Sequence, residues 1–211
     1  MDIINLLAVV VLSYLIGSLP TAYIFGKLMK NIDIREHGSG NVGATNAFRV
    51  LGKGPGSAVL VIDIIKGIIP IVVVAGFLAA YPFGRIVAAV AVVCGHNWTC
   101  FLNFKGGKGI ATSLGVLIGL TAAIPEARMA VLWCVAAWAV SFLISGIVSI
   151  SSIIAAVVLP IVMIAYVVPT SLVLLSVVFC IFVVFRHRPN IQRFLKGQES
   201  GVRMPWHPKV K

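Results

Sequence analysis

Long apolar runs, separated by short breaks rich in Pro, Gly and Ser, are the dominant pattern along this 211-residue chain. The runs contain about 15–22 apolar residues, which is close to the length that a helix needs to cross a hydrocarbon layer of about 30 Å. The pattern therefore predicts an all-α polytopic membrane protein. Its seven expected spans lie at residues 4–25, 56–80, 85–100, 110–124, 129–145, 148–168 and 170–185.

Several of these segments are short for a full crossing, namely the third, fourth, fifth and seventh. The third and fourth could instead form a re-entrant pair, which would leave five spans. Removing two spans does not change parity, so the two termini are expected on opposite sides of the membrane in either case. The first run has no basic start and no small-residue cleavage site, so it is predicted to be a spanning helix and not a signal peptide.

Composition supports a membrane protein, because hydrophobic residues make up 60% of the chain and charged residues only 11%. Soluble domains carry about 25% charged residues. We find no linker and no internal repeat, and expect a single integral membrane domain over residues 1–211 with a basic tail at 186–211. The four cysteines fit no zinc spacing and are interpreted as packing residues.

The positive charges are distributed unequally, and this predicts the orientation. Five Lys and Arg fall in the 26–55 loop, two in the 101–109 loop and seven in the tail, whereas the opposite side has only Arg85 and Arg128. The positive-inside rule then places the N-terminus outside and the C-terminus in the cytoplasm. Although the net charge is +11, its position beside membrane ends indicates anionic headgroups as partners and not nucleic acid.

Three short polar stretches interrupt the apolar pattern, at residues 38–46, 95–109 and 186–190, and Arg193 follows the third. Each follows an apolar segment and offers backbone N–H groups or cationic side chains with almost no acid, which is the make-up of an anion site. All three are predicted on the cytoplasmic side. They can therefore converge on one site, and the chain is expected to handle phosphate next to lipid.

The first stretch is rich in small residues, which let the backbone turn tightly and point several N–H groups at one anion. It also matches G-x-G-x-x-G, but a spanning helix precedes it and no βαβ unit surrounds it, so a dinucleotide fold is excluded. A flexible Gly-rich loop is the competing interpretation. The candidate substrate-binding residues are Ser39, Gly40, Asn41, Gly43, Ala44, Thr45, Asn46 and, one helical turn further, Arg49.

In the second stretch, two lysines flank paired glycines just before an apolar helix. A Gly-rich approach to a helix N-terminus favours phosphate, although the residues do not form a Walker A loop. The competing interpretations are a simple turn with positive-inside lysines and, for His96 beside Trp98, an interfacial anchor. The candidates are His96 and Lys108 for catalysis and Asn97, Lys105, Gly106, Gly107 and Gly109 for binding.

In the third stretch, His187 and Asn190 are three residues apart and would face one ligand in a helix, which makes them catalytic candidates. Arg186 and Arg193 are candidate substrate-binding residues, with an electrostatic stop-transfer patch as the alternative. Ser149, in a predicted cytoplasmic turn, is a further binding candidate, against the simpler interpretation of a helix cap.

Asp63 and Lys66 lie inside the second predicted span, on one helical face. Charges within a membrane are costly and are usually paired or functional. A mutual ion pair that steadies the site is expected, with direct substrate contact as the alternative.

Missing features also restrict the chemistry. The sequence has no nucleophile with a paired base and acid, no carboxylate cluster for a metal, no C-x-x-C, and no His followed by Asp five residues later. We therefore expect no metal and no cofactor, and catalysis that rests on anion binding and positioning.

Taken together, the residues resemble the PlsY family, the bacterial acyl-phosphate:glycerol-3-phosphate acyltransferases. The resemblance covers nearly the whole chain and is carried by the segments Gly38–Asn46, Asp63–Gly67, Gly95–Asn97, Lys105–Gly109 and Arg186–Ile191. It does not extend to the residues after Gly197, to which no function is assigned.

The resemblance implies transfer of a fatty acyl group from acyl phosphate to the sn-1 hydroxyl of glycerol 3-phosphate, giving lysophosphatidic acid for phospholipid synthesis. It implies a multi-pass protein of the bacterial cytoplasmic (inner) membrane with its active site on the cytoplasmic face, in contact with membrane lipids. We expect acyl phosphate near residues 39–46 and glycerol 3-phosphate near Arg49, Lys105 and Lys108.

His187 and Asn190 are expected to orient the attacking hydroxyl. The base is left open between His96, His187 and the donor's own phosphate, and the phosphate is favoured because the sequence reveals no carboxylate that would orient a histidine. A transporter or flippase of an anionic phosphate compound is the alternative function, and an acyltransferase with a thioester donor is a third.

Overall fold

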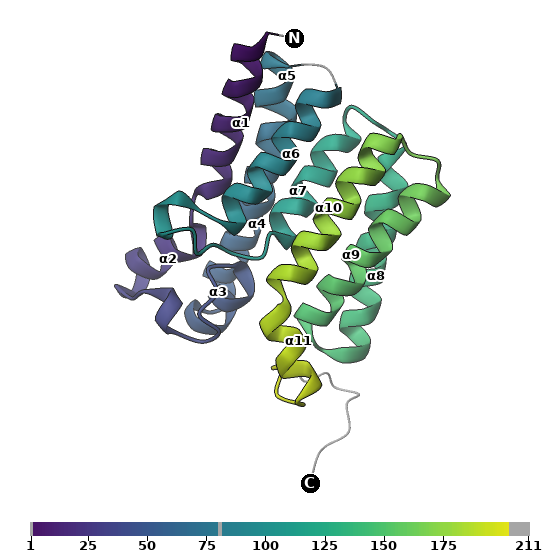
Figure 1. Cartoon of the computed structure of the whole chain (residues 1–211). Coiled ribbons are helices and arrows are strands. Elements are labelled where there is room, and N and C mark those ends of the chain that lie inside the picture. The colour runs from purple at the N-terminus through teal and green to yellow at the C-terminus, as the bar shows by residue number, and fades with distance from the viewer. Residues whose placement is uncertain (1, 80–81, 203–211) are drawn as a thin grey trace. The chain divides into compact units, whose positions relative to one another are not determined.

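The computed structural model describes residues 2–79 and 82–202, with only the backbone of Pro82. The described residues form helices and no strands (Figure 1). The basic residues of the tail that the sequence analysis counted at positions 203, 209 and 211 lie outside this description. Contacts between Cα atoms divide the chain into two compact units, residues 1–128 and 129–211. Each unit is described by itself.

Unit 1 contains four long or apolar helices and several short ones. These four are α1 (Ile3–Ser18), α4 (Lys53–Ile69), α6 (Pro82–Asn97) and the shorter, apolar α7 (Ile110–Thr121). Between them lie α2 (Thr21–Lys30), η1 (Ile34–Glu36), α3 (Ala44–Leu51), η2 (Pro70–Val74), α5 (Ala75–Leu78) and η3 (Cys100–Leu102). α1 packs on α6, α4 packs on α7, and α3 packs on α4.

Glycines allow the close approach of these helix pairs. A side chain at Gly17 of α1 would collide with the Val92 carbonyl of α6, and one at Gly67 of α4 would collide with the Thr112 carbonyl of α7. Small residues at such crossings let helix backbones meet where lipid supplies no hydrophobic driving force. Tyr14 donates to the Trp98 carbonyl at 2.7 Å, which ties the end of α6 to the end of α1.

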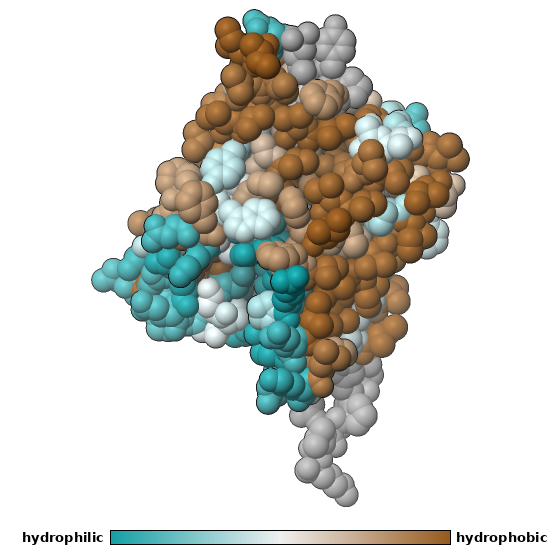
Figure 2. Space-filling model, viewed as in Figure 1, coloured by the Kyte–Doolittle hydropathy of each residue, from teal (hydrophilic) through white to brown (hydrophobic). Residues whose placement is uncertain are grey.

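This packing places the first two polar stretches at the same end of unit 1. α2 continues from the end of α1 and contacts α3, while Thr99 donates to the Ser18 carbonyl at 2.5 Å. Hydrophilic residues of this unit gather over α2 and α3, away from the N-terminus (Figure 2). The exposed side chains of α1 and α4 are mainly apolar, which fits contact with lipid.

Unit 2 contains most of α8 (Ala127–Ser145), then α9 (Val148–Ala165), α10 (Thr170–Arg186) and α11 (Arg188–Leu195). α9 packs on α10, and Trp138 of α8 donates to Ser152 of α9 at 3.2 Å. The chain bends by 56° between α10 and α11. After α11, Gly197 adopts a left-handed φ of 66° and Val202 donates to the Gly146 carbonyl, so the segment returns to the turn between α8 and α9.

All seven predicted spans coincide with helices, but the number of full crossings is smaller. Among the residues that the structure describes, five helical segments are long and apolar enough to cross a membrane, and α10 with α11 makes a sixth if the bent pair is one span. α7 has 12 residues, or about 18 Å, and is too short to cross alone. The chain is therefore a multi-pass membrane protein. Which side each terminus occupies, and whether the two units act as one membrane domain, stay predictions.

Candidate active site

Asn46 organises the first polar stretch. Its side-chain amide nitrogen donates to the carbonyls of Ile34, at 3.2 Å, and His37, at 3.0 Å, and its carbonyl oxygen accepts from the backbone N–H of Ser39, at 2.8 Å. The residue is only 1% exposed. Asn46 was predicted to bind substrate, but both of its N–H groups are used within the loop. We infer that it shapes the loop on which other residues act.

The loop ends at the N-terminus of α3, which no side chain caps. Gly43 precedes the helix, and Ala44 and Thr45 form its first turn. Thr45 is exposed, as is Arg49 one turn later. A helix N-terminus carries partial positive charge and unsatisfied N–H groups, so this corner suits an anion. Ser39, Gly40 and Asn41 lie in the same loop, partly or fully exposed to solvent.

The side chain of Arg35, just before this stretch, interacts with Asp33 and Tyr23 and not with the loop 38–46. Its guanidinium forms an ion pair with Asp33 at 2.6 Å and lies over the ring of Tyr23 at 5.3 Å. The hydrogen bonds from Arg35 lower the pKa of Asp33 to about 2. The pair is therefore ionised at neutral pH, and the contact of Arg35 with Tyr23 links this loop to α2.

The paired glycines of the second stretch lie directly on the end of α6. Gly106 donates to the Asn97 carbonyl at 3.2 Å and Gly107 to the His96 carbonyl at 2.9 Å. A side chain at Gly107 would collide with the His96 ring, so only glycine fits there. This loop is therefore built onto His96 and Asn97, which favours a shaped binding loop over a simple turn.

The second stretch leads into α7 through Gly109, which adopts a left-handed φ of 79° at the N-cap. Lys105 is exposed and Lys108 is half-buried in the same loop. The loop thus brings two cations and a helix N-terminus together, as phosphate binding requires.

Asn97 is fully buried, yet neither polar atom of its side chain has a partner among the residues that the structure describes. Its carbonyl oxygen faces Gly109, where an added side chain would approach it to 2.8 Å. Buried amides without partners are rare, and each calls for an explanation such as a functional role or a bound water or ion. Asn97 is therefore a good candidate to bind substrate at the start of α7.

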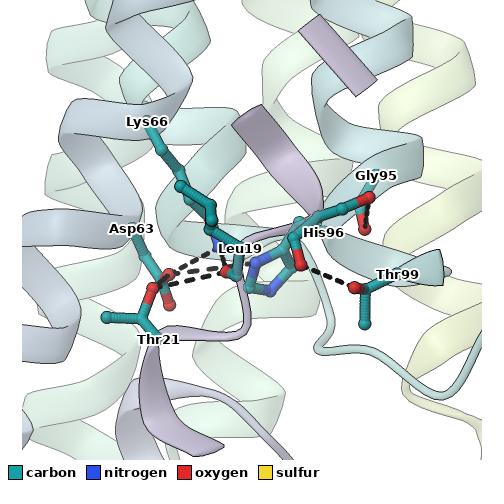
Figure 3. Close-up of polar contacts among 8 residues, drawn as sticks. Leu19, Thr21, Asp63, Lys66, Gly95, His96 and Thr99 are labelled. Atoms are coloured by element: carbon teal, nitrogen blue, oxygen red, sulfur yellow. Dashed lines mark hydrogen bonds and ion pairs between the residues drawn. The ribbon is translucent and has the colours of Figure 1, made fainter. Parts of the chain in front are cut away.

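A buried charged network lies next to this loop (Figure 3). Lys66 forms the expected ion pair with Asp63 at 2.8 Å and also donates to the Leu19 carbonyl at 2.9 Å. Thr21 donates to Asp63 at 2.9 Å. Both charged side chains are less than 5% exposed. The network joins α4 to the break between α1 and α2.

His96 lies at the edge of this network. Its Nδ1 lies 4.0 Å from a carboxylate oxygen of Asp63, which is too far for a hydrogen bond and would be an ion pair only with a protonated ring. A carboxylate is therefore near His96, but this contact does not contradict the expectation that no carboxylate orients a histidine. The sequence could not reveal the pair, because the two residues come from different helices.

His187 has a defined proton arrangement at the end of α10 in unit 2. Its Nδ1 lies 2.8 Å from the Val183 carbonyl, which accepts only, so Nδ1 carries a proton. In the neutral ring, Nε2 is then an acceptor, which suits a residue that orients a hydroxyl. Arg186 precedes it and is half-buried.

Glu199, which the sequence analysis assigned to no site, gathers three predicted site residues of unit 2. Ser149 donates to Oε1 of Glu199 at 2.7 Å and Asn190 donates to the same oxygen. Arg193 forms an ion pair with Oε2 at 2.7 Å. Only one sequence signal was present, a single acid in a strongly basic tail, two residues after Gly197.

Comparisons with known proteins identify the family of this chain. A family model described as glycerol-3-phosphate acyltransferase matches residues 7–197. This chain belongs to that family. Glycerol-3-phosphate acyltransferase 2 of Moorella thermoacetica is 43% identical over 92% of this chain and 95% of its own length. The glycerol-3-phosphate acyltransferase of Gloeobacter violaceus is 39% identical over 92% of this chain and 93% of its own length.

Solved structures of the family agree with this assignment. The glycerol 3-phosphate form of PlsY (YgiH), an integral membrane glycerol 3-phosphate acyltransferase, is 34% identical to this chain. It matches with a TM-score of 0.85 over 94% of this chain and 96% of its own. The lysophosphatidic acid form matches with a TM-score of 0.82 at 33% identity. The family assignment favours the predicted acyltransferase over the transporter alternative.

Proposed function

We propose that this protein transfers a fatty acyl group to the sn-1 hydroxyl of glycerol 3-phosphate and releases lysophosphatidic acid, with acyl phosphate as the donor. The observation that carries the proposal is the second polar stretch, whose glycines are built onto His96 and Asn97 and lead two lysines into a helix N-terminus. Membership of the glycerol-3-phosphate acyltransferase family supports the acceptor.

Acyl phosphate is a mixed anhydride and is already activated. The enzyme therefore needs to hold two phosphate-bearing substrates and to offset charge as inorganic phosphate leaves. We place the donor phosphate at the loop 39–46 and the first turn of α3. We place the phosphate of the acceptor at Arg49, Lys105 and Lys108, and assign Asn97 and Gly109 to the same binding loop.

The reaction forms one bond and breaks one. The sn-1 oxygen attacks the carbonyl carbon, the bond between that carbon and the phosphate oxygen breaks, and the hydroxyl proton goes to a base. We retain the departing phosphate as that base, because His96 is only 7% exposed behind Gly107. His187, through Nε2, orients the attacking hydroxyl, as does Asn190.

The position in the cell follows from the charge asymmetry. Basic residues concentrate in the loops and tail predicted to face the cytoplasm, so we propose a cytoplasmic active site at the bacterial inner membrane. The acyl chain of the donor would lie along the apolar helices.

The test uses purified protein with radiolabelled glycerol 3-phosphate and synthetic acyl phosphate. Formation of labelled lysophosphatidic acid that depends on both substrates is expected. A protein that folds and yet forms no such product would contradict the proposal.

A further inference from the structure

The C-terminal end of α6 takes its hydrogen-bond partners from other segments of unit 1. The last four carbonyls of a helix have no N–H partner inside the helix and must be satisfied from outside. In α6, Ser18 of α1 donates to the Gly95 carbonyl at 3.4 Å. The next two carbonyls, of His96 and Asn97, accept from the paired glycines of the second polar stretch. The proposed phosphate loop, residues 105–109, therefore caps α6.

This capping changes what the paired glycines can do. Gly106 and Gly107 were candidates for substrate binding, but the N–H groups of both donate to carbonyls of α6. We therefore assign the phosphate to Lys105, Lys108 and the first turn of α7. Where these groups lie depends on the path of the loop, so a residue that fixes this path affects binding.

Thr99, to which the proposed mechanism gives no role, holds the chain between α6 and the loop. Its side chain is buried, with the residue 2% exposed. The hydroxyl of Thr99 donates to the Ser18 carbonyl at 2.5 Å and accepts from the Phe101 N–H at 3.2 Å. The carbonyl of Thr99 accepts from the N–H groups of Leu102, at 3.3 Å, and Phe104, at 2.9 Å. Thr99 thus ties this segment to α1.

The same segment contains a backbone conformation that side chains disfavour. Asn103 and Phe104 have φ angles of 53° and 58°, in the left-handed region. For a residue as bulky as Phe, this conformation costs free energy and persists only where the surrounding structure imposes it. The hydrogen bonds to Thr99 impose it here, and the chain then returns to the end of α6.

We propose that Thr99 is a positioning residue for acyl transfer. Its hydrogen bond to α1 fixes the loop that carries Lys105 and Lys108, and with it the place of the acceptor's phosphate. Thr99 acts through this loop and not on the substrate. Tyr14 of α1 assists, since its hydroxyl donates to the Trp98 carbonyl at 2.7 Å. This inference rests on the proposed function and deepens it.

The test compares Thr99→Val with Thr99→Ser. Valine has nearly the shape of threonine but no hydroxyl, whereas serine keeps the hydroxyl and loses a methyl group. Steady-state kinetics on purified protein give KM and kcat with glycerol 3-phosphate and acyl phosphate varied in turn.

In Thr99→Val, kcat/KM for glycerol 3-phosphate should fall about tenfold to a hundredfold, since displacement of a binding group by about 1 Å can cost about a hundredfold. KM for glycerol 3-phosphate should rise, while KM for acyl phosphate stays unchanged, because we place the donor phosphate at the loop 39–46. Thr99→Ser should recover most of the loss. A residue that only supported the fold would lower kcat through the folded fraction and leave both KM values unchanged.

Amide hydrogen exchange observes the loop without any need for activity. The N–H groups of Gly106 and Gly107 are hydrogen-bonded, so they should be protected in the wild-type protein. In Thr99→Val, the peptide that contains them should exchange about tenfold faster or more. Peptides from α4 should exchange as in the wild-type protein, which separates a local change from general destabilisation.

Thr121→Val is the matched control, because the hydroxyl of Thr121 donates to the Ile118 carbonyl of its own helix, at 2.7 Å. This variant should keep wild-type kinetics and exchange. If Thr99→Val does not fold, Tyr14→Phe takes its place, since it removes the hydrogen bond to the Trp98 carbonyl. Tyr14→Phe should raise KM for glycerol 3-phosphate about threefold to tenfold, the worth of one hydrogen bond.

Two results would overturn the inference. The first is wild-type kinetics and loop exchange in Thr99→Val, or in Tyr14→Phe where that variant takes its place. The second is a loss confined to kcat, with both KM values unchanged, which would make Thr99 a structural residue alone. A wild-type protein without acyl transfer would instead refute the proposed function, and the exchange experiment would still test the hold of Thr99 on the loop.

Discussion

At the scale of single residues, the account depends on cations that hold phosphate. Lys108→Ala and Arg49→Ala each remove one charge-assisted contact, worth roughly 1.5–3 kcal/mol. Each variant should therefore lower kcat/KM for glycerol 3-phosphate by about tenfold to a hundredfold. Steady-state kinetics on purified protein test this expectation.

Lys53→Ala is a suitable control. Lys53 is exposed and belongs to the same predicted 26–55 loop as Arg49, but we place Lys53 outside the site. Its kinetics should match the wild-type protein. Unchanged KM and kcat in Lys108→Ala would remove Lys108 from the site.

The contact between Gly107 and the His96 ring gives a second prediction. Gly107→Ala puts a methyl group where the ring lies, so the loop must move. Displacement of a binding group by about 1 Å can cost about a hundredfold in rate, and we expect a loss of that order in kcat/KM.

Gly54→Ala is the matched control for this loss, because a side chain at Gly54 would contact nothing within 4 Å. If Gly107→Ala were as active as Gly54→Ala, the loop would not need its contact with His96.

At the scale of elements, the buried pair of Asp63 and Lys66 holds α4 against the break between α1 and α2. Lys66→Met leaves an unpaired carboxylate in an apolar region, which should destabilise the protein by about 3–5 kcal/mol. The double variant Asp63→Leu with Lys66→Met should recover part of that loss, because no charge is then left alone. Unfolding in detergent, followed by denaturant titration, measures both.

Two outcomes would contradict a stabilising interaction between Asp63 and Lys66. Additive losses in the double variant would mean that the two charges do not interact. A fully stable Lys66→Met variant would mean that the pair contributes nothing to the fold.

The helices themselves could be read from the sequence, because apolar length decides where a membrane helix forms. The shorter features could not. Pro20 removes a backbone N–H and divides the first predicted span into α1 and α2, while α3 lies inside what looked like a loop. Gly67 of α4 and Gly115 of α7 let these two helices pack closely. This packing stabilises α7, although α7 is too short to cross the membrane by itself.

The arrangement of the candidate site was predictable only where a local sequence pattern determines it. Glycines followed by lysine and a helix indicate a phosphate loop by themselves. The approach of His96 to Asp63, and that of Ser149 to Glu199, joins segments far apart in the chain. Spacing contains no information on such pairs, because packing alone creates them.

At the scale of the whole molecule, the charge asymmetry predicts the orientation. Single cysteines placed in residues 38–46 or 101–109, in a background without native cysteines, should resist membrane-impermeant reagents on intact cells. The same positions should react in inside-out vesicles. Labelling of the 101–109 loop from outside would contradict a cytoplasmic phosphate site.

The identity of the donor tests the central claim most directly. Purified protein is given glycerol 3-phosphate with either acyl phosphate or acyl-CoA, and lysophosphatidic acid is measured with and without inorganic phosphate. A pocket of N–H groups fits a departing phosphate and offers little to a departing thiolate. The account predicts turnover with acyl phosphate, inhibition of that turnover by inorganic phosphate, and negligible product from acyl-CoA. Comparable rates from both donors, with no effect of phosphate, would contradict it.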